Sequence, residues 1–147
     1  MAFKYNQSAG EEKKYVSKPG TYVASVTSIK VDYLPPRSDL MLKVGFTTTD
    51  GEICFGEIFA KPDKDGNHYR LESFMASTAN DDEIKEYINN GETEVDESFF
   101  NIIVSRSLGR NLKVKVTERK YVKKDGSEGV AYSASSFSRL PDGPGAF

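Results

Sequence analysis

The chain has 147 residues, of which 37% are hydrophobic and 29% are charged, with a net charge of −2. This composition fits one globular domain with its own core, and no apolar run approaches the roughly 18 residues that a membrane span needs. One cysteine (Cys54) and one histidine (His68) exclude an internal disulfide and argue against a zinc site of the Cys/His type.

Composition divides the chain into three parts. Residues 1–18 are polar and predict a flexible N-terminal arm, while residues 19–140 carry the apolar patterns of a single domain. Residues 141–147 are rich in proline and glycine and predict a flexible tail, because they bury too little apolar surface to offset the entropy of ordering. No secretory-type apolar segment follows Met1, so we expect a cytoplasmic protein without a membrane anchor.

Three strands are predicted in the first part of the domain. Residues 21–33 are rich in β-branched side chains and are partly apolar on both faces, which indicates a strand that bends across two layers. Residues 40–48 alternate, and the turn at Asp50-Gly51 leads into a third strand over 52–60. Cys54 is expected to be a buried small hydrophobe. The inward residues of the second strand are Leu40, Leu42, Val44 and Phe46.

The middle of the chain changes to a helical period. Apolar residues at i, i+3 and i+4 predict a helix over 69–76. A second helix is predicted over 81–90, with Asp81 as its cap and Gly91 just beyond its end. Residues 99–104 are strongly apolar and fit either a short buried strand or a helix. The buried stripe expected for the second helix is Ile84, Tyr87 and Ile88.

Residues 111–139 predict a long β-hairpin, closed by an Asp-Gly turn within 124–127. Side chains alternate between the two faces of a strand, so the first arm has one apolar and one basic face. The apolar face is Leu112, Val114 and Val116. The other face is Lys113, Lys115, Thr117, Arg119, Tyr121 and Lys123.

The order of three strands, one or two helices and two strands is that of an OB-fold. We therefore predict a mainly β, α+β protein: a five-stranded, OB-fold-like Greek-key barrel with short helices and a long basic hairpin. A small barrel explains how all five apolar faces reach one core. A β-sandwich with a helical insertion is the competing architecture.

Charge is segregated along the sequence. Residues 81–97 contain eight acidic residues against one lysine (Lys85), a net −7, and residues 103–124 contain eight basic residues against one acid (Glu118), a net +7. Such blocks create local potentials that the total charge hides. They fit two solvated faces of opposite sign, or a polyanion site. One hypothesis is that the acidic segment borders the basic site when no ligand is bound.

Cations and aromatic rings on strands are the features that hold single-stranded nucleic acid, the cations at phosphates and the rings against bases. Tyr121 is the best stacking candidate because it shares a face with the lysines. Tyr132 and Phe137 have opposite parity, so one of the two is expected in the core. The candidate nucleic-acid-binding residues are Lys113, Lys115, Arg119, Tyr121, Lys123, Arg106, Arg110, Arg37, Lys43, Tyr33, Phe55, Tyr132 and Phe137.

Catalytic motifs are missing from the sequence: it has no Walker loop, no paired Asp/Glu-x-x-His and no Gly-x-Ser-x-Gly. Asp81, Asp82 and Glu83 are better explained by helix capping than by a metal. We therefore expect a protein that is not an enzyme and that has no catalytic residues, metal or cofactor. No base-specific readout is visible, so binding should tolerate any sequence.

Five short motifs within residues 18–126 carry a resemblance, spanning roughly residues 18–140, to a known class of proteins. They are Lys18-Pro-Gly-Thr-Tyr22, Leu40-Met-Leu-Lys-Val44, Arg70-Leu-Glu-Ser-Phe74, Gly109-Arg-Asn-Leu-Lys-Val114 and Tyr121-Val-Lys-Lys-Asp-Gly126. In this order they resemble phage-encoded single-stranded-DNA-binding proteins, which are small OB-fold proteins of replication or recombination. The resemblance implies cooperative protection of exposed single strands in the cytoplasm of the host cell.

The resemblance also makes the C-terminal tail a candidate docking peptide for replication or recombination proteins, with Phe147 as its partner-docking residue. Well-known single-strand binders end in a dense acidic tail, whereas Asp142 is the only acidic side chain here. The leading interpretation is thus a sequence-tolerant single-stranded-DNA-binding protein. Binding of RNA in place of DNA, and assembly into a homo-oligomer, are left open by the sequence. The alternative is a non-catalytic interaction or structural module that uses the basic hairpin.

Overall fold

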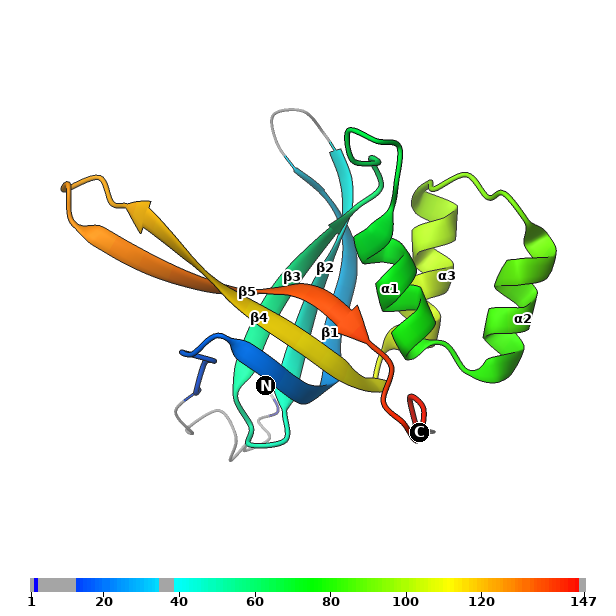
Figure 1. Cartoon of the computed structure of the whole chain (residues 1–147), viewed down its shortest axis with the longest axis horizontal. Helices are drawn as coiled ribbons and strands as arrows, with labels where there is room; N and C mark the ends of the chain where they lie inside the picture. Colours follow the sequence, from blue (N-terminus) through cyan, green and yellow to red (C-terminus); the bar gives the residue numbers. More distant parts are fainter. Residues whose placement is uncertain (1, 3–12, 35–38, 146–147) are drawn as a thin grey trace.

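The computed structural model describes residue 2 and residues 13–34 and 39–145. This part of the chain forms five strands and three helices (Figure 1). In chain order they are β1 (Gly20–Leu34), β2 (Asp39–Thr48), β3 (Ile53–Phe59), α1 (Tyr69–Thr78), α2 (Asp81–Asn90), α3 (Glu97–Ser107), β4 (Asn111–Val122) and β5 (Glu128–Ser138). None of these helices is long and apolar enough to cross a membrane.

The strands form one antiparallel sheet in the order β3-β2-β1-β4-β5. Its two edge strands approach each other at Gly56 of β3, where an added Cβ would lie 2.9 Å from the carbonyl oxygen of Ala134 in β5. This order, with the helices inserted between the third and fourth strands, is the OB-fold order predicted from the sequence. The mainly β, OB-fold-like class is confirmed, with three helices rather than one or two.

A β-bulge at Thr27 explains why β1 is apolar on both faces. Register advances from Val26–Phe46 to Ser28–Gly45, so Thr27 has no partner on β2. One extra residue reverses the alternation, and both halves of the strand can then face the core. Ala24 and Val26 are buried before the bulge, and Ile29 and Val31 pack against the core after it. The predicted bend of this strand is therefore a bulge.

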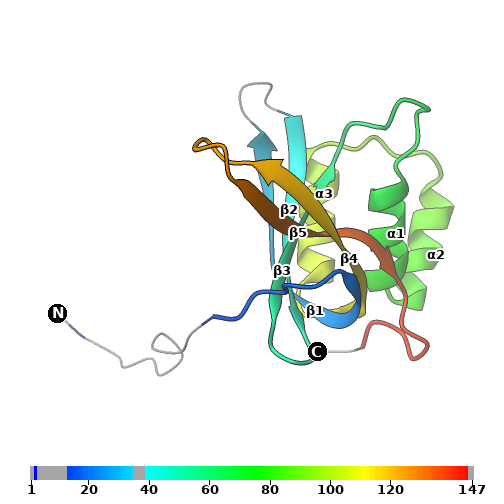
Figure 2. The same cartoon turned by 60° about the vertical axis from the view of Figure 1, so that its left-hand side comes forward.

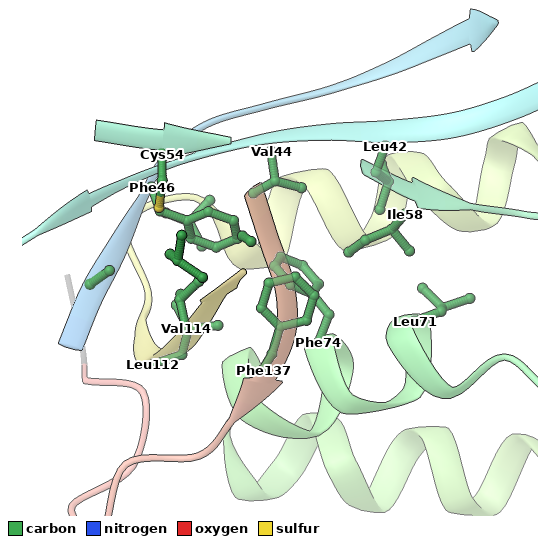
Figure 3. Packing of buried hydrophobic residues seen from close by; sticks show 14 of the residues in the cluster. Leu42, Val44, Phe46, Cys54, Ile58, Leu71, Phe74, Leu112, Val114 and Phe137 are labelled. Atoms are coloured by element: carbon green, nitrogen blue, oxygen red, sulfur yellow. The ribbon is translucent and has the colours of Figure 1, made fainter. Parts of the chain in front are cut away.

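Three phenylalanines link the sheet to α1 at the centre of the core (Figure 3). Phe137 of β5 lies 5.5 Å from the ring of Phe46 in β2 and 5.3 Å from the ring of Phe74 in α1. The Phe74 pair is nearly edge-on, a favourable aromatic geometry. Val114 and Leu112 of β4 are fully buried beside them, so the apolar face of the hairpin is part of the same core.

The helices begin and end largely where the sequence predicts. The apolar residues 99–104 lie in α3, which Asp96 caps by accepting the N–H of Phe99. The cap of α2 is Asn80 rather than Asp81, in a capping box with Glu83. The buried stripe predicted for α2 is wrong, because no residue of this helix is buried and Ile88 is 72% exposed.

The packed domain extends beyond the predicted limits of residues 19 and 140. Val16 is buried in the core, and its N–H donates to the carbonyl of Ile53. At the other end Pro144 is buried, and its carbonyl accepts the N–H of Asn111 at the start of β4. Residues 13–18 and 141–145, which the sequence places in an arm and a tail, therefore contact the barrel.

The hairpin β4–β5 projects from the barrel. β4 pairs with β1 only as far as Val116, opposite Gly20, and beyond that residue its only ladder partner is β5. In both views the helices lie together on one side while the hairpin tip points away from them (Figure 1, Figure 2). The long hairpin predicted from the sequence is confirmed, and its outer half is a two-stranded ribbon.

Gly56 tests the contact between the two edge strands. We expect Gly56→Val to lower the free energy of unfolding by about 1–3 kcal/mol, because its side chain meets the backbone of Ala134, which cannot rotate away. Urea denaturation measures this loss. Glu57→Val, at the exposed neighbouring position, is the control and should be within about 0.5 kcal/mol of the parent. Equal stabilities of the two variants would contradict a close approach of β3 and β5.

Candidate nucleic-acid interface

The outward side of β4 carries the residues that we call the basic face: Lys113, Lys115, Arg119, Tyr121 and Lys123. Alternation places it opposite the buried Leu112, Val114 and Val116, so core packing fixes its orientation near the barrel. Lys113 is half-buried and the other four are exposed. Among the described residues, none of the four cations forms an ion pair with a carboxylate. The face can therefore accept phosphates without first breaking a salt bridge.

The ring of Tyr121 lies across the opposite strand, over its register partner Gly129. A Cβ added at Gly129 would clash with the ring and would lie 2.7 Å from the Tyr121 hydroxyl oxygen. The missing side chain thus leaves a platform on which the ring rests, as aromatic residues often do over glycines in sheets. Tyr121 remains 42% exposed, so its other side is free to meet a ligand.

Phe55 on β3 repeats this arrangement. Its register partner on β2 is Gly45, and a Cβ added there would lie 3.3 Å from the Cε1 atom of the Phe55 ring. The ring is 54% exposed and borders a shallow pocket, to which Lys30 and Lys43 also contribute. Tyr15 lies beside it, with 6.5 Å between ring centroids. We call Tyr15, Lys30, Lys43 and Phe55 the β2–β3 patch.

Lys43 shares its patch with one carboxylate. Its Nζ lies 3.4 Å from Asp32, which also accepts the backbone N–H of Tyr33. That N–H, together with the side chain of Lys43, lowers the pKa of Asp32 below its usual value. The ion pair is exposed and therefore weak, so a phosphate could replace the carboxylate at Lys43.

Arg106 and Arg110 are paired with carboxylates of α2 in this structure, so neither is free to meet a phosphate as the sequence suggests. Arg110 donates to Glu83 at 2.8 Å and to the carbonyl of Thr78, also at 2.8 Å. Arg106 donates to Glu86 at 2.7 Å, and its guanidinium lies 5.2 Å from the ring centre of Tyr87. Both arginine side chains are largely buried. They attach α2 to the rest of the domain.

The acidic segment does not border the basic face. Its helix α2 lies at one end of the long axis of the molecule and the hairpin tip lies at the other (Figure 1). Besides the pairs with Arg106 and Arg110, Asp81 accepts from Arg139 at 3.0 Å. The hypothesis that residues 81–97 cover the basic strand within one chain is therefore wrong, and part of their charge holds arginines instead.

The other aromatic candidates differ in how far their rings are exposed. Phe137 is buried in the core and cannot stack on a base. The opposite faces predicted for Tyr132 and Phe137 are wrong, because Ser135 is left without a partner and reverses the alternation, so Tyr132 opposite Glu118 shares the face of Phe137 opposite Val114. Tyr132 packs half-buried against the core. Tyr33 is exposed, but its hydroxyl donates to Glu97 of α3 at 2.6 Å, and this bond, with the charge of Glu97, raises its pKa. Tyr33 thus faces α3, on the opposite side of β1 from Lys30.

Two predicted residues, Arg37 and Phe147, lie outside the described residues. Sequence reasoning missed Tyr15 and Lys30 of the β2–β3 patch. Lys30 has the sequence parity of the buried Ala24 and Val26 and lies outward only because the bulge at Thr27 reverses the strand. Tyr15 is placed by an isolated bridge to Ile53 that no periodicity reveals. Within the described ranges, no three His, Cys, Asp or Glu side chains gather as metal ligands.

Glu83 is expected to contribute to stability in a pH-dependent way. Burial raises its pKa, but the bonds from Arg110 and the Asn80 backbone and the charges of Arg110 and Arg106 outweigh burial and lower it. A lowered pKa means that the stabilisation is present above the ordinary value of 4.5 and is lost as pH falls through the folded-state value.

We therefore expect Glu83→Gln to cost about 1–2 kcal/mol at neutral pH, less than a fully buried pair because water still reaches the site. Urea unfolding as a function of pH should show the difference in unfolding free energy between variant and parent shrinking as pH falls below 4.5 and through the lowered pKa of Glu83. Glu86→Gln, at a more exposed partner of Arg106, is the control and should change stability by less than about 0.5 kcal/mol. If Glu83→Gln remained less stable than the parent at acid pH, the ionised Glu83 would not be the source of the stabilisation.

No protein-family model matches the chain, and no curated protein matches it in sequence. Among solved structures, the chain is similar to yeast RPA bound to ssDNA. The two share 11% identity over 95% of this chain and 83% of that one, with a TM-score of 0.41. A likeness of this degree is no basis for transferring a ligand.

Proposed function

We propose that this protein binds single-stranded DNA without sequence preference, without catalysis, and in support of phage DNA replication or recombination. One observation carries the proposal: two exposed rings, Tyr121 and Phe55, each lie over a cross-strand glycine and share their side of the sheet with lysines. A ring supported from below can stack on an unpaired base, and nearby cations can hold the adjoining phosphates.

The chemistry of the two clusters supports single strands over other anions. Stacking requires a free base face, which a duplex does not offer. The two clusters consist of lysines, one arginine and aromatic rings, and a ring can stack on any base, which favours tolerance of sequence. The replication or recombination role and the host cytoplasm rest on the resemblance of the five sequence motifs, and Phe147 stays a proposed docking residue for partner proteins.

A salt titration with labelled oligo-dT tests the proposal. If about four to six phosphates are neutralised, the logarithm of affinity should fall with the logarithm of salt at a slope of about −3 to −4. Fluorescence anisotropy at several salt concentrations gives this slope directly. An affinity that is insensitive to salt, or no binding of oligo-dT, would contradict the proposal and would favour an interaction module.

A further inference from the structure

The helices carry an apolar groove that no part of the described chain covers. It lies between α1, α2 and the segment that leads into α3, and its apolar lining is Leu71, Met75, Tyr87, Ile88, Val95 and Phe99. A helix that presents an apolar stripe normally buries it. Here α2 buries no residue, and Ile88 is 72% exposed.

The groove has an acidic rim. Glu72 lines it, and Glu92 and Glu94 flank the lining residues Gly91, Thr93 and Val95. All three carboxylates are exposed, and in the described part of the chain none of them forms an ion pair. An occupant of this groove should therefore combine apolar side chains with cations.

The projecting ribbon has such a surface on the side opposite the basic face. Register pairs Lys120 with Val130 and Val122 with Glu128, so these four side chains share one face. Val122 is 74% exposed, and Val130 is exposed beside Lys120. The ribbon tip from 119 to 130 has four cations and two acids, a net charge of +2. Neither valine has a role in the barrel core or in the basic face.

We propose that the hairpin of one copy of this chain docks in the helical groove of a second copy, with Val122 and Val130 against Ile88 and Lys120 near the acidic rim. The two surfaces lie at opposite ends of the long axis, so the hairpin cannot fill the groove of its own chain (Figure 1). Such a contact joins two different surfaces and is therefore heterologous. The basic face stays free on the other side of the ribbon.

The contact needs no nucleic acid, so it stands or falls separately from the proposed function. Combined with that function, it would join neighbouring protomers along a strand. It also gives the exposed apolar residues of α2 and of the ribbon a common purpose, since unpartnered apolar surface of this kind marks interaction sites.

Two variants with complementary defects test the proposal in the absence of DNA. Val122→Asp/Val130→Asp disables the hairpin surface, and Ile88→Asp disables the groove, because each places an unpaired carboxylate in an apolar contact. All three positions are exposed, so both variants should retain the circular dichroism spectrum of the parent. Leu108→Asp, at an exposed leucine outside both surfaces, is the control.

Sedimentation velocity up to about 0.5 mM detects contacts with dissociation constants near 1 mM. The parent and Leu108→Asp should sediment faster as concentration rises, and each disabled variant alone should remain a monomer. An equimolar mixture of the two disabled variants should form a dimer, because one intact hairpin meets one intact groove. A monomeric parent, continued self-association of Ile88→Asp, or a mixture that stays monomeric would each overturn the proposal.

Discussion

Reversing the charge of Lys113 and Lys115 should weaken binding of oligo-dT by at least about 100-fold. Each lysine would supply a charge-assisted contact worth about 1.5–3 kcal/mol, and two glutamates would repel the phosphates in addition. The slope of log affinity against log salt should become shallower by about 1.4, the share of two phosphate contacts. Anisotropy titrations of Lys113→Glu/Lys115→Glu against the parent measure both quantities.

The matched control is Lys64→Glu/Lys85→Glu, which changes the net charge equally at exposed positions in a loop and on α2. Its affinity should remain within about threefold of the parent, because charges more than a Debye length of about 10 Å from a ligand are largely screened. If both double variants lost the same affinity for oligo-dT, binding would depend only on the total charge of the protein. The basic face would then not be the DNA-binding site.

Removal of the Tyr121 or Phe55 ring should cause the second largest loss of affinity for oligo-dT. We expect Tyr121→Ala and Phe55→Ala each to lower affinity by about 5- to 150-fold, the range for loss of one base stack of about 1–3 kcal/mol. The salt slope should not change, because no cation is lost. This separates the rings from the lysines, whose loss changes affinity and slope together.

Conservative variants distinguish stacking from simple loss of surface. Tyr121→Phe and Phe55→Tyr keep a ring over Gly129 and Gly45, so both should bind within about twofold of the parent. Gly129→Val should behave like Tyr121→Ala, since its side chain would displace the ring while every cation remains. Strong binding by Gly129→Val would contradict the idea that the glycine platform presents the ring.

Strict alternation made the hairpin predictable from sequence. Leu112, Val114 and Val116 must share a face, and burial of that face fixes where Lys113 and Lys115 point. The same logic gave the strand order, because apolar faces of five strands with helices between the third and fourth fit few architectures. Alternation could not predict the bulge at Thr27, where one extra residue switches the side of the sheet to which the following side chains of β1 point.

The arginines show where charge counts fail. Arg106 and Arg110 lie beside the basic strand in sequence, yet α3 and its end place them against Glu83 and Glu86 of a helix that precedes them by about 20 residues. Segregated blocks of opposite charge in a sequence thus became partners in space. Only a long-range contact decides whether a cation is free for a ligand or already paired.

Glycine opposite an aromatic residue is a signal that single-strand patterns miss. Phe55 and Tyr121 look like any other strand aromatics until register places Gly45 and Gly129 beneath them. Phe137 is a strand phenylalanine like Phe55, but it is buried, because its side of β5 faces Phe46 and Phe74. Burial of a strand aromatic depends on which residue the partner strand presents.

The central claim is that exposed rings and cations on this barrel hold unpaired bases and their phosphates. A competition between single-stranded and duplex oligonucleotides of equal length, at one salt concentration, tests it most directly. The account predicts that the single strand displaces a labelled oligo-dT at a concentration at least about tenfold lower than the duplex, since only unpaired bases can stack. Equal competition, or a preference for the duplex, would contradict it.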